Sequence, residues 1–438
     1  MSKEAIERRQ FVKHSTVLAA TVSAFPGGAH SQNEDSEKLK VALIGCGGRG
    51  TGAAAQALAA DDQAVLWSMA DIDREQLDRS RETLRKNAPD PKQVDVAPER
   101  EFIGLEAYRR VMDDAEVDVV ILTTPPGFRP YHFEAAVAAG KHVFMEKPVA
   151  VDSAGVRRVL EAAKLSKEKG LKVGVGFNRR HSPIHHEVIS RLHDGDIGEL
   201  PLVQIFNCRS DVNKRRERVP GESELQFQVK NWYYFTWLSG DFMVEQSVHE
   251  FDVVRWIKGD VFPLQCQGQG GRLVRTGPTN GQIYDHFSVD YEFADGSLVT
   301  TQHRHIPKCW NWFGEKIFGT DGTAELSFKR AGFVRPNDPG KDAWRGTEKQ
   351  NSYQLEHDVL FRSIRNGEPF NEAERGAYST LFAIMGRMAA YTGQVVTWEQ
   401  ALQSEEELTI HPAAWDEEAP LQPDRNGLYE PFRPGLEI

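Results

Sequence analysis

The chain has few cysteines and no cysteine motif. Its 438 residues include four cysteines, at positions 46, 208, 266 and 309. None has the Cys-x-x-Cys spacing of zinc and iron–sulfur sites, so we expect no metal centre. Disulfides do form in exported proteins. Because Cys46 lies inside a glycine-rich loop, however, four unpaired thiols are the favoured interpretation.

Excess positive charge and membrane-length apolar runs are also missing. The formal net charge is −11 at pH 7, and no basic stripe stands out, so we expect no nucleic-acid partner. The only long apolar run near the N-terminus covers residues 16–25. That is shorter than the ~20 residues needed to span a bilayer. We therefore expect no membrane anchor.

The start of the chain is typical of a twin-arginine export signal. Residues 7–13 contain Arg8 and Arg9 and are followed by the apolar run 16–25 and a group of small residues. This order is that of a cleaved signal. We expect a signal and linker over 1–33 and a periplasmic protein, exported folded with its cofactor. The alternative is a disordered basic N-terminus that happens to contain two arginines.

Strands and helices alternate in the following part of the chain. Short apolar runs predict strands at 39–44, 64–70, 117–124, 142–145 and 171–177, and helical patterns lie at 51–60, 74–87, 132–139 and 153–169. Such alternation predicts a parallel, doubly wound sheet. The fold class is therefore α/β, with a dinucleotide-binding domain expected over 34–150.

From residue 201 the pattern changes. Strands are predicted at 201–209, 264–274, 286–293 and 297–305, with turns at 294–297 and 319–322 and helices at 352–366 and 374–393. Hairpin turns between strands indicate an antiparallel sheet. We expect this second domain over 151–403. An acidic, proline-rich tail over 404–438 is expected to pack on another subunit or to be loose.

A glycine fingerprint is the strongest motif. Gly45, Gly47 and Gly50, with Gly48 and Arg49 between them, follow a predicted strand and open a predicted helix. Glycine permits a tight turn and a close approach of the backbone to a pyrophosphate. The phosphates then meet free N–H groups at the helix N-terminus. The motif predicts a nicotinamide dinucleotide.

An acidic residue supports this prediction. Asp71 ends the second predicted strand, 21 residues after Gly50. A carboxylate at that place binds the hydroxyls of the adenosine ribose. It favours NAD, whereas the nearby Arg49 and Arg74 leave NADP open because either can hold a 2′-phosphate.

Two further segments contain groups suited to proton transfer. Glu146-Lys147-Pro148 closes a strand at the carboxyl edge of the sheet, where ligands of such sheets bind. A desolvated lysine there has a lowered pKa and can exchange a proton with a substrate hydroxyl. A surface lysine before a turn is the alternative.

Glu245 and His249 are four residues apart in a segment that fits one continuous helix. They would share one helix face, where the carboxylate orients the histidine. Removal of hydride from a carbinol leaves a proton on oxygen, and a histidine titrating near pH ~6.5 is suited to accept it. An exposed Glu–His pair without function is the alternative.

Together these motifs resemble the glucose–fructose oxidoreductase, inositol dehydrogenase and MocA (Gfo/Idh/MocA) superfamily. The resemblance includes Gly176-Phe177-Asn178-Arg179-Arg180 and covers roughly residues 38–400. It implies a Rossmann domain followed by an α/β domain with a large, mostly antiparallel open sheet. It also implies NAD or NADP, a small-molecule carbohydrate substrate and a homodimer or homotetramer.

The resemblance also implies site residues. Lys147, Glu245 and His249 are the implied catalytic residues, although the usual residues at 245 and 247 are Asp and Gly and here are Glu245 and Ser247. Further cofactor contacts are expected at Thr124, Pro125, His132, Glu146 and Lys147. Substrate contacts are expected at Asn178, Arg179, Tyr233, Trp237, Asp252 and Tyr284.

Some of these expectations have structural alternatives. Sugar faces stack on aromatic rings, which suits the aromatic cluster at 232–237, but packing at a domain seam explains it equally. His181, His185 and His186 are interpreted as helix-surface residues. His303 and His305 share a strand face without a third ligand, so we expect no metal there.

Three functions fit the sequence. The first is an exported oxidoreductase that transfers hydride between a sugar, polyol or glycoside and a tightly held nicotinamide. The second is a redox-neutral glycosidase that oxidises, eliminates and reduces again, with Tyr233 or His249 as the base. The third is a sugar-binding protein without catalysis.

Overall fold

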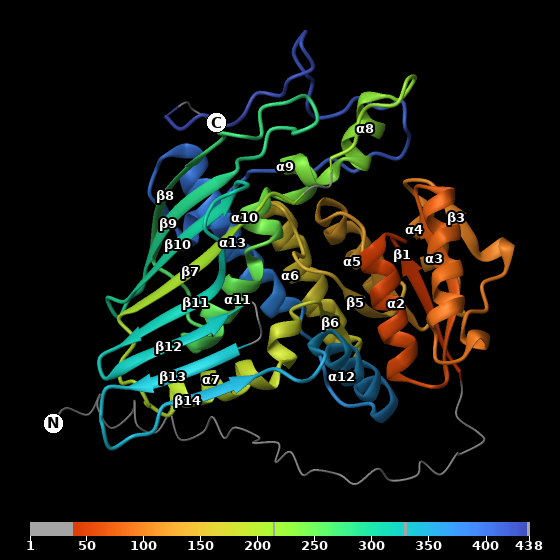
Figure 1. Cartoon of the computed structure of the whole chain (residues 1–438). Helices are drawn as coiled ribbons and strands as arrows, with labels where there is room; N and C mark the ends of the chain where they lie inside the picture. Colours follow the sequence, from red (N-terminus) through yellow and green to blue (C-terminus); the bar gives the residue numbers. More distant parts are fainter. Residues whose placement is uncertain (1–37, 213–214, 328–330, 436–438) are drawn as a thin grey trace. The chain divides into compact units, whose positions relative to one another are not determined.

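The computed structural model describes residues 38–435 except 213–214 and 328–330, so the predicted export signal lies outside the described residues. Two sheets form the frame of the described chain (Figure 1). One has six strands, in the order β3-β2-β1-β4-β5-β6. The other has nine, in the order β14-β13-β12-β11-β7-β10-β9-β8-β15.

All pairings in the six-stranded sheet are parallel. Its strands are β1 (Leu39–Ile44), β2 (Ala64–Asp71), β3 (Glu101–Ile103), β4 (Val119–Leu122), β5 (His142–Met145) and β6 (Val173–Val175). Its helices are α2 (Gly48–Ala60), α3 (Arg74–Asn87), α4 (Ala107–Met112), α5 (Arg129–Ala138) and α6 (Ser153–Glu168). Every residue of β4 is buried, as expected for a parallel sheet covered on both faces. The predicted Rossmann sheet is confirmed.

The nine-stranded sheet is antiparallel except between β7 and β10. Its strands are β7 (Leu202–Arg209), β8 (Gln265–Gly271), β9 (His286–Glu292), β10 (Leu298–His305), β11 (Trp312–Gly319), β12 (Gly322–Ser327), β13 (Ala331–Pro336), β14 (Trp344–Thr347) and β15 (Val396–Thr397). Alternate residues of β9 are buried and exposed, which is typical of a sheet with one covered face. The expected second domain with a mostly antiparallel sheet is confirmed.

The remaining helices are α7 (Pro183–His193), α8 (Glu224–Lys230), α9 (Thr236–Ser239), α10 (Phe242–Glu245), α11 (Val248–Ile257), α12 (Ser352–Asn366), α13 (Ala373–Thr392) and α14 (Trp398–Gln403). Of these, α10, α11 and α13 lie between the two sheets (Figure 1). Short 3-10 turns are η1 (Pro91–Gln93), η2 (Pro98–Arg100), η3 (Pro126–Phe128), η4 (Asn178–His181) and η5 (Trp232–Tyr234). Helix α13 packs on α6 and β8, and α12 packs on α2. The second domain therefore contacts the Rossmann domain through helices.

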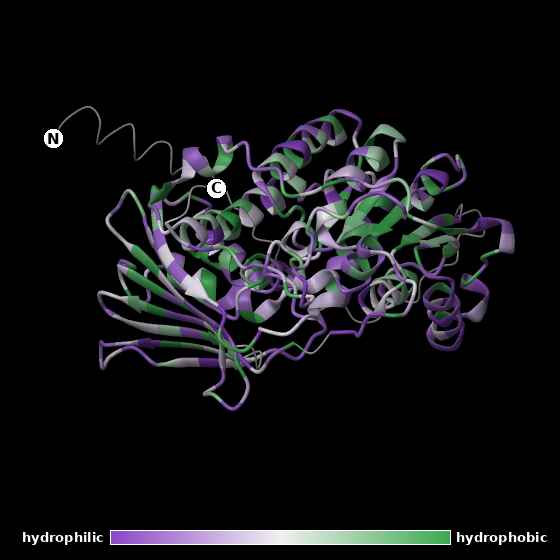
Figure 2. Cartoon of the chain, turned by 90° about the horizontal axis from the view of Figure 1, so that it is seen from above, coloured by the Kyte–Doolittle hydropathy of each residue, from purple (hydrophilic) through white to green (hydrophobic). Residues whose placement is uncertain are grey.

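Hydropathy follows this arrangement (Figure 2). The central Rossmann strands are mostly hydrophobic, whereas the strands of the large sheet mix hydrophobic and hydrophilic residues. Within the described part of the chain, no helix combines the length and apolar character needed to cross a membrane.

The C-terminal tail packs on its own chain. The backbone N–H groups of Leu408 and Thr409 donate to Asp152 Oδ2 at 2.8 and 3.2 Å. Trp415 and Leu421 pack against a buried cluster that includes Trp237. The expectation of a loose tail is therefore wrong for its described residues, because its apolar side chains have partners within the chain, whereas contact with another subunit stays a prediction.

Gly386 of α13 tests how closely helix and sheet pack. An added Cβ would lie 1.9 Å from Tyr291 Oη and 2.5 Å from Met243 Cε. We expect Gly386→Ala to lower the free energy of unfolding by about 1–3 kcal/mol, because overpacking forces buried groups apart. Urea denaturation of the full chain measures this.

Gly52→Ala in α2 is the matched control, since its added Cβ would meet only Arg49 Nη1, at 3.6 Å. It should leave the free energy of unfolding unchanged or raise it by about 0.4–1 kcal/mol. Equal stability of Gly386→Ala and the unsubstituted protein would contradict the close packing.

Candidate active site

The glycine fingerprint forms a tight turn between β1 and α2. Gly45 has a φ of +95°, which a side chain disfavours. A Cβ at Gly50 would lie 2.0 Å from the Gly45 carbonyl oxygen, so both positions require glycine. At Gly47, an added Cβ would have no described heavy atom within 4 Å. The outer face of the turn is therefore open to a ligand.

This turn presents hydrogen-bond donors. Helix α2 has no acidic residue in its first turn, and Gly47 provides no side-chain cap. Its first N–H groups are thus suited to bind an anion such as a pyrophosphate. The residues at the fingerprint fit a dinucleotide.

Asp71 connects the fingerprint with β2. Its Oδ2 accepts the N–H of Cys46 at 2.5 Å, and its Oδ1 accepts the N–H of Asp73 at 2.9 Å. Burial raises the pKa of Asp71, and these backbone N–H groups oppose the rise. Asp73 in turn caps α3. The carboxylate is therefore fixed at the end of β2, where the sequence predicts ribose binding.

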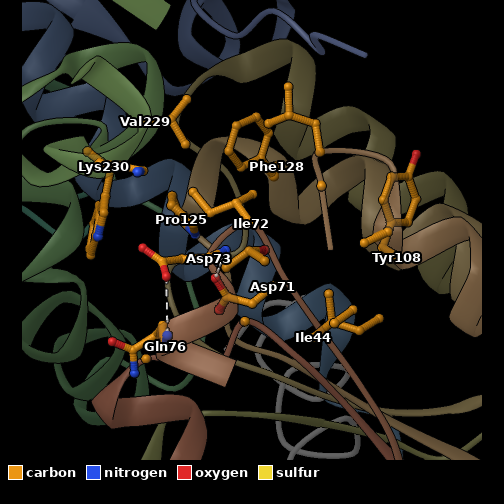
Figure 3. A pocket seen from close by; sticks show the side chains of 18 of the residues that line it. Ile44, Asp71, Ile72, Asp73, Gln76, Tyr108, Pro125, Phe128, Val229 and Lys230 are labelled. Carbon is orange, nitrogen blue, oxygen red and sulfur yellow. Dashed lines mark hydrogen bonds between the residues drawn. The ribbon is translucent and has the colours of Figure 1, made fainter. Parts of the chain in front are cut away.

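A cavity of about 500 Å³, here the fingerprint cavity, lies over this turn. Gly45, Gly47, Asp71, Thr124, Pro125 and His132 contribute to its lining. Its other walls come from the second domain and the tail, through Arg216, Val219, Val229, Lys230, Trp232, His411 and Pro412. Figure 3 shows Asp71, Asp73 and Gln76 with Val229 and Lys230 across from them. No sequence motif predicted these outer walls.

A second cavity, here the catalytic cavity, has a volume of about 710 Å³. It shares Thr123, Thr124 and Trp232 with the fingerprint cavity. Its lining brings together the predicted residues Arg49, Glu146, Lys147, Asn178, Arg179, Glu245 and His249. Residues distant in sequence therefore meet beside the carboxyl end of β5.

Lys147 follows β5 and contacts the second domain. Its Nζ donates to the backbone carbonyl of Glu245 at 2.6 Å and lies 3.5 Å from Glu245 Oε1. Only 12% of the Lys147 side chain is exposed. Its ammonium group is thus held in place at the seam between the domains.

The predicted single helix through Glu245 and His249 is wrong. Helix α10 ends at Glu245 and α11 begins at Val248. The break is stabilised at Ser247, whose hydroxyl contacts His303 Nδ1 at 2.8 Å and accepts from Asn207 Nδ2 at 3.0 Å. Both Glu245 and His249 nevertheless line the catalytic cavity. The side chain of Glu245 bonds to Lys147 and Gln246.

His249 is neutral at pH 7. Burial lowers its pKa well below the ordinary value, and the positive charges of Lys147, Arg179 and Arg49 lower it further. Its Nδ1 is buried and has no hydrogen-bond partner among the described residues. Phe177 packs edge-on against the ring, with centroids 6.0 Å apart. The imidazole is therefore unprotonated, and the same burial and charges make it a weaker base than the ordinary histidine expected from the sequence.

His185 differs from its prediction as a surface residue. It is buried and lines the catalytic cavity. Its Nδ1 lies 2.8 Å from Ser182 Oγ. Burial, assisted by the Arg179 charge, lowers the pKa of His185 to about 3.

Arg179 carries two ion pairs. It contacts Glu315 at 2.8 Å and also binds Glu250, and all three side chains are largely buried. Burial raises the pKa of both glutamates, and Arg179 partly offsets this. Asn178 donates to Ser352 Oγ at 2.8 Å.

The two arginines considered for a 2′-phosphate are paired with carboxylates. Arg49 binds Glu146 and lies 3.2 Å from Glu356. Arg74 binds Glu101. Arg49 therefore lies in the catalytic cavity, away from the ribose position at Asp71.

Four predicted substrate contacts lie in the core and line neither cavity. Tyr233 is buried near His305. Trp237 Nε1 donates to Gln228 Oε1 at 2.8 Å. Tyr284 Oη donates to the carbonyl of Phe432 at 2.8 Å, and Asp252 pairs with Arg180 at 2.9 Å. Seam packing thus explains most of the aromatic cluster, and only Trp232 of it lines the cavities.

Sequence reasoning missed Arg129 and Arg209, which both line the catalytic cavity. Arg129 is buried and donates to the carbonyl groups of Leu122 and Thr124. Burial lowers its pKa to about 10. Neither arginine belongs to a motif, so only the fold could reveal them.

The buried histidine predicts a pH dependence of stability. Unfolded His185 binds a proton near pH ~6.5, whereas the folded residue does so only near a pKa of about 3. Stability is therefore full above pH ~6.5 and falls below it. Between pH ~6.5 and ~5 one such group costs about 1.6 kcal/mol. In urea denaturation, the free energy of unfolding of His185→Gln should fall by this amount less over the same pH range than that of the unsubstituted protein. An equal fall in both proteins would contradict the prediction.

Known proteins resemble the Rossmann part of this chain. Residues 39–177 match the family model GFO_IDH_MocA, described as an oxidoreductase family with an NAD-binding Rossmann fold. An inositol 2-dehydrogenase of Rhizobium meliloti is 29% identical over 192 residues, 43% of this chain and 52% of the relative. The uncharacterized oxidoreductase YrbE of Bacillus subtilis is 24% identical over 51% of this chain and 59% of the relative. The chain thus spans little more than half the length of these relatives.

Other matches are longer. A myo-inositol 2-dehydrogenase of Thermotoga maritima is 25% identical over 344 residues, 76% of this chain and 90% of the relative. Two solved structures show the same fold.

The first is an aldose–aldose oxidoreductase from Caulobacter crescentus complexed with glycerol, with a TM-score of 0.64, 18% identity, and coverage of 82% of this chain and 100% of the other. The second is a levoglucosan dehydrogenase in complex with NADH and levoglucosan, with a TM-score of 0.64, 18% identity, and coverage of 83% and 100%. Residues 39–177 are therefore similar to the NAD-binding Rossmann domain of the Gfo/Idh/MocA oxidoreductase family.

Proposed function

We propose that this protein is a nicotinamide-dependent oxidoreductase that acts on a sugar, polyol or glycoside. The observation that carries the proposal is the meeting of the two cavities at Thr123, Thr124 and Trp232. A dinucleotide held at the fingerprint is thereby directed toward Lys147 and His249. The names of the relatives, inositol dehydrogenases and a levoglucosan dehydrogenase, support the substrate class.

The side chains of the catalytic cavity can handle the hydroxyl proton. When bound, the nicotinamide supplies the hydride acceptor. An ammonium group has three donors, two of which Glu245 engages, and Lys147 uses the third to hold the substrate oxygen. Neutral His249 accepts the proton as hydride leaves the carbon. Glu245 positions Lys147.

NAD is the preferred cofactor in this proposal. Asp71 lies in the fingerprint cavity, where its carboxylate accepts ribose hydroxyls and repels a 2′-phosphate. Arg49 and Arg74 are already paired with carboxylates. The outer walls contributed by residues 216–232 and 411–412 support tight retention of the cofactor. Export and a homo-oligomeric state stay predictions from the sequence.

His249→Asn should slow reduction of bound NAD by about 10²- to 10⁴-fold, the usual contribution of a general base. Single-turnover absorbance of the NAD-loaded protein, with myo-inositol, levoglucosan and glucose as trial substrates, measures this rate. The dissociation constant of NAD should change little. Lys147→Met should show the same pattern.

His286→Asn is the matched control, because His286 is 45% exposed and lines neither cavity. An unaltered rate in His249→Asn, or no reduction with any trial substrate, would contradict the proposal. Release of nitrophenol from nitrophenyl glycosides without accumulated NADH would instead support the redox-neutral glycosidase.

Protein purified without added cofactor should contain about one dinucleotide per chain. The reason is that the Rossmann residues, residues 216–232 and residues 411–412 all line the cavity and would slow release of the cofactor. Acid denaturation followed by mass spectrometry identifies and quantifies what is released, and the mass distinguishes NAD from NADP. Asp71→Ala should lose most of it. An empty protein that binds added NAD only weakly would refute tight retention.

A further inference from the structure

Arg209 lies beside the proposed proton-transfer residues. It is the last residue of β7, and its half-buried side chain lines the catalytic cavity. Its Nη2 donates to Gln246 Oε1 at 2.8 Å. Gln246 donates to Glu245, which pairs with Lys147. Two side chains therefore separate the guanidinium from the lysine.

The other cationic side chains of this cavity have compensating partners. Arg49 binds Glu146 and Glu356, Lys147 binds Glu245, and Arg179 binds Glu250 and Glu315. Arg129 is buried against two backbone carbonyls of the Rossmann sheet edge. Each of these groups is thus neutralised or hydrogen-bonded within the protein.

Arg209 has a hydrogen bond to Gln246 but no carboxylate in direct contact, and Glu250 attracts its charge only from a greater distance. Among the described residues, no carboxylate forms an ion pair with it. The acidic residue nearest to it in sequence, Asp211, pairs with Arg275 at 2.9 Å and with Arg215 at 3.2 Å. Phe313 lies beside the guanidinium, with its ring centroid 5.8 Å away. A half-buried charge without a directly paired carboxylate is costly, so the site favours an incoming anion.

The chemistry of the group defines that anion. A guanidinium presents a planar fork of N–H donors that matches the oxygens of a carboxylate or a phosphate. We propose that Arg209 is a specificity-determining residue that binds an oxyanion on the substrate, so that an acidic sugar is preferred over a neutral one. This inference rests on the proposed function, because it assumes that the substrate occupies the catalytic cavity.

The position of Arg209 also orients the substrate. Glu245 and Gln246 lie between Lys147 and Arg209 along the cavity wall. With its anion at Arg209, a sugar presents a hydroxyl several bonds away to Lys147 and His249. The reacting carbon is therefore remote from the acidic group, and the acidic group itself stays unchanged.

Isothermal titration of the NAD-loaded full chain at low salt tests the preference. The probes are glucose, glucuronate and glucose 6-phosphate, which share a ring and differ in charge. At least one of the two anions should bind about 10- to 100-fold more tightly than glucose, as expected for a charge-assisted pair. Which anion binds more tightly distinguishes a carboxylate from a phosphate.

Variants locate the preference. Arg209→Gln should bring the Kd of the preferred anion close to that of glucose, and Arg209→Lys should restore part of the difference, since the charge remains without the fork. Arg304→Gln is the matched control. Arg304 lies on the neighbouring strand β10, donates to the carbonyl of Trp310 and does not line the cavity, so its replacement should preserve the preference.

The inference is overturned if neither anion binds more tightly than glucose, or if Arg209→Gln keeps the difference. In either case the proposed function still holds if a neutral sugar reduces the bound NAD. Failure of every sugar to reduce it, with the anion preference intact, counts instead against the proposed function alone.

Discussion

The contact between Lys147 and Glu245 connects the two halves of the site. Lys147 belongs to the Rossmann sheet edge and Glu245 to the end of α10, and the bond joins an ammonium group to a backbone carbonyl at 2.6 Å. Because the acceptor is backbone, the contact fixes the path of the chain where α10 stops. It therefore sets the position of His249 at the start of α11. A shift of either domain would separate the lysine from the histidine.

Around this contact the cavity combines many charges with neutral histidines. Arginine and glutamate side chains pair in its walls, while burial and the same arginines keep His185 and His249 uncharged. A proton acceptor is thus maintained beside fixed positive charge. In such a cavity the paired groups mainly determine geometry, whereas the groups without compensation are available to a ligand.

Much of the fold follows from local patterns. The apolar runs before Gly45 and before Asp71 are long enough to identify buried strands, and glycine spacing identifies the turn between strand and helix. The expected second sheet is confirmed in the structure. It could be predicted because hairpin turns are signalled by residues adjacent in the sequence. Strand β3, with three residues, and helix α4, with six, are too short to show a period.

Features of the site that depend on long-range contacts were not predictable in this way. The break after Glu245 depends on Ser247, whose hydroxyl is bonded by His303 and Asn207 from other strands. Trp237 was expected to contact the substrate, but its indole Nε1 donates a hydrogen bond to Gln228. The exposure of Arg209 to the cavity follows only from where β7 ends. Sequence spacing identifies which groups are present, and tertiary packing decides which of them remain free.

The residues that line the fingerprint cavity are translated at different times. The glycine turn at 45–50 is translated long before His411 and Pro412, which contribute to the lining of its cavity. Until residues 216–232 and 411–412 are in place, the turn has only the part of the lining that the Rossmann residues provide. A dinucleotide can therefore reach the glycine turn before the rest of its cavity has formed around it.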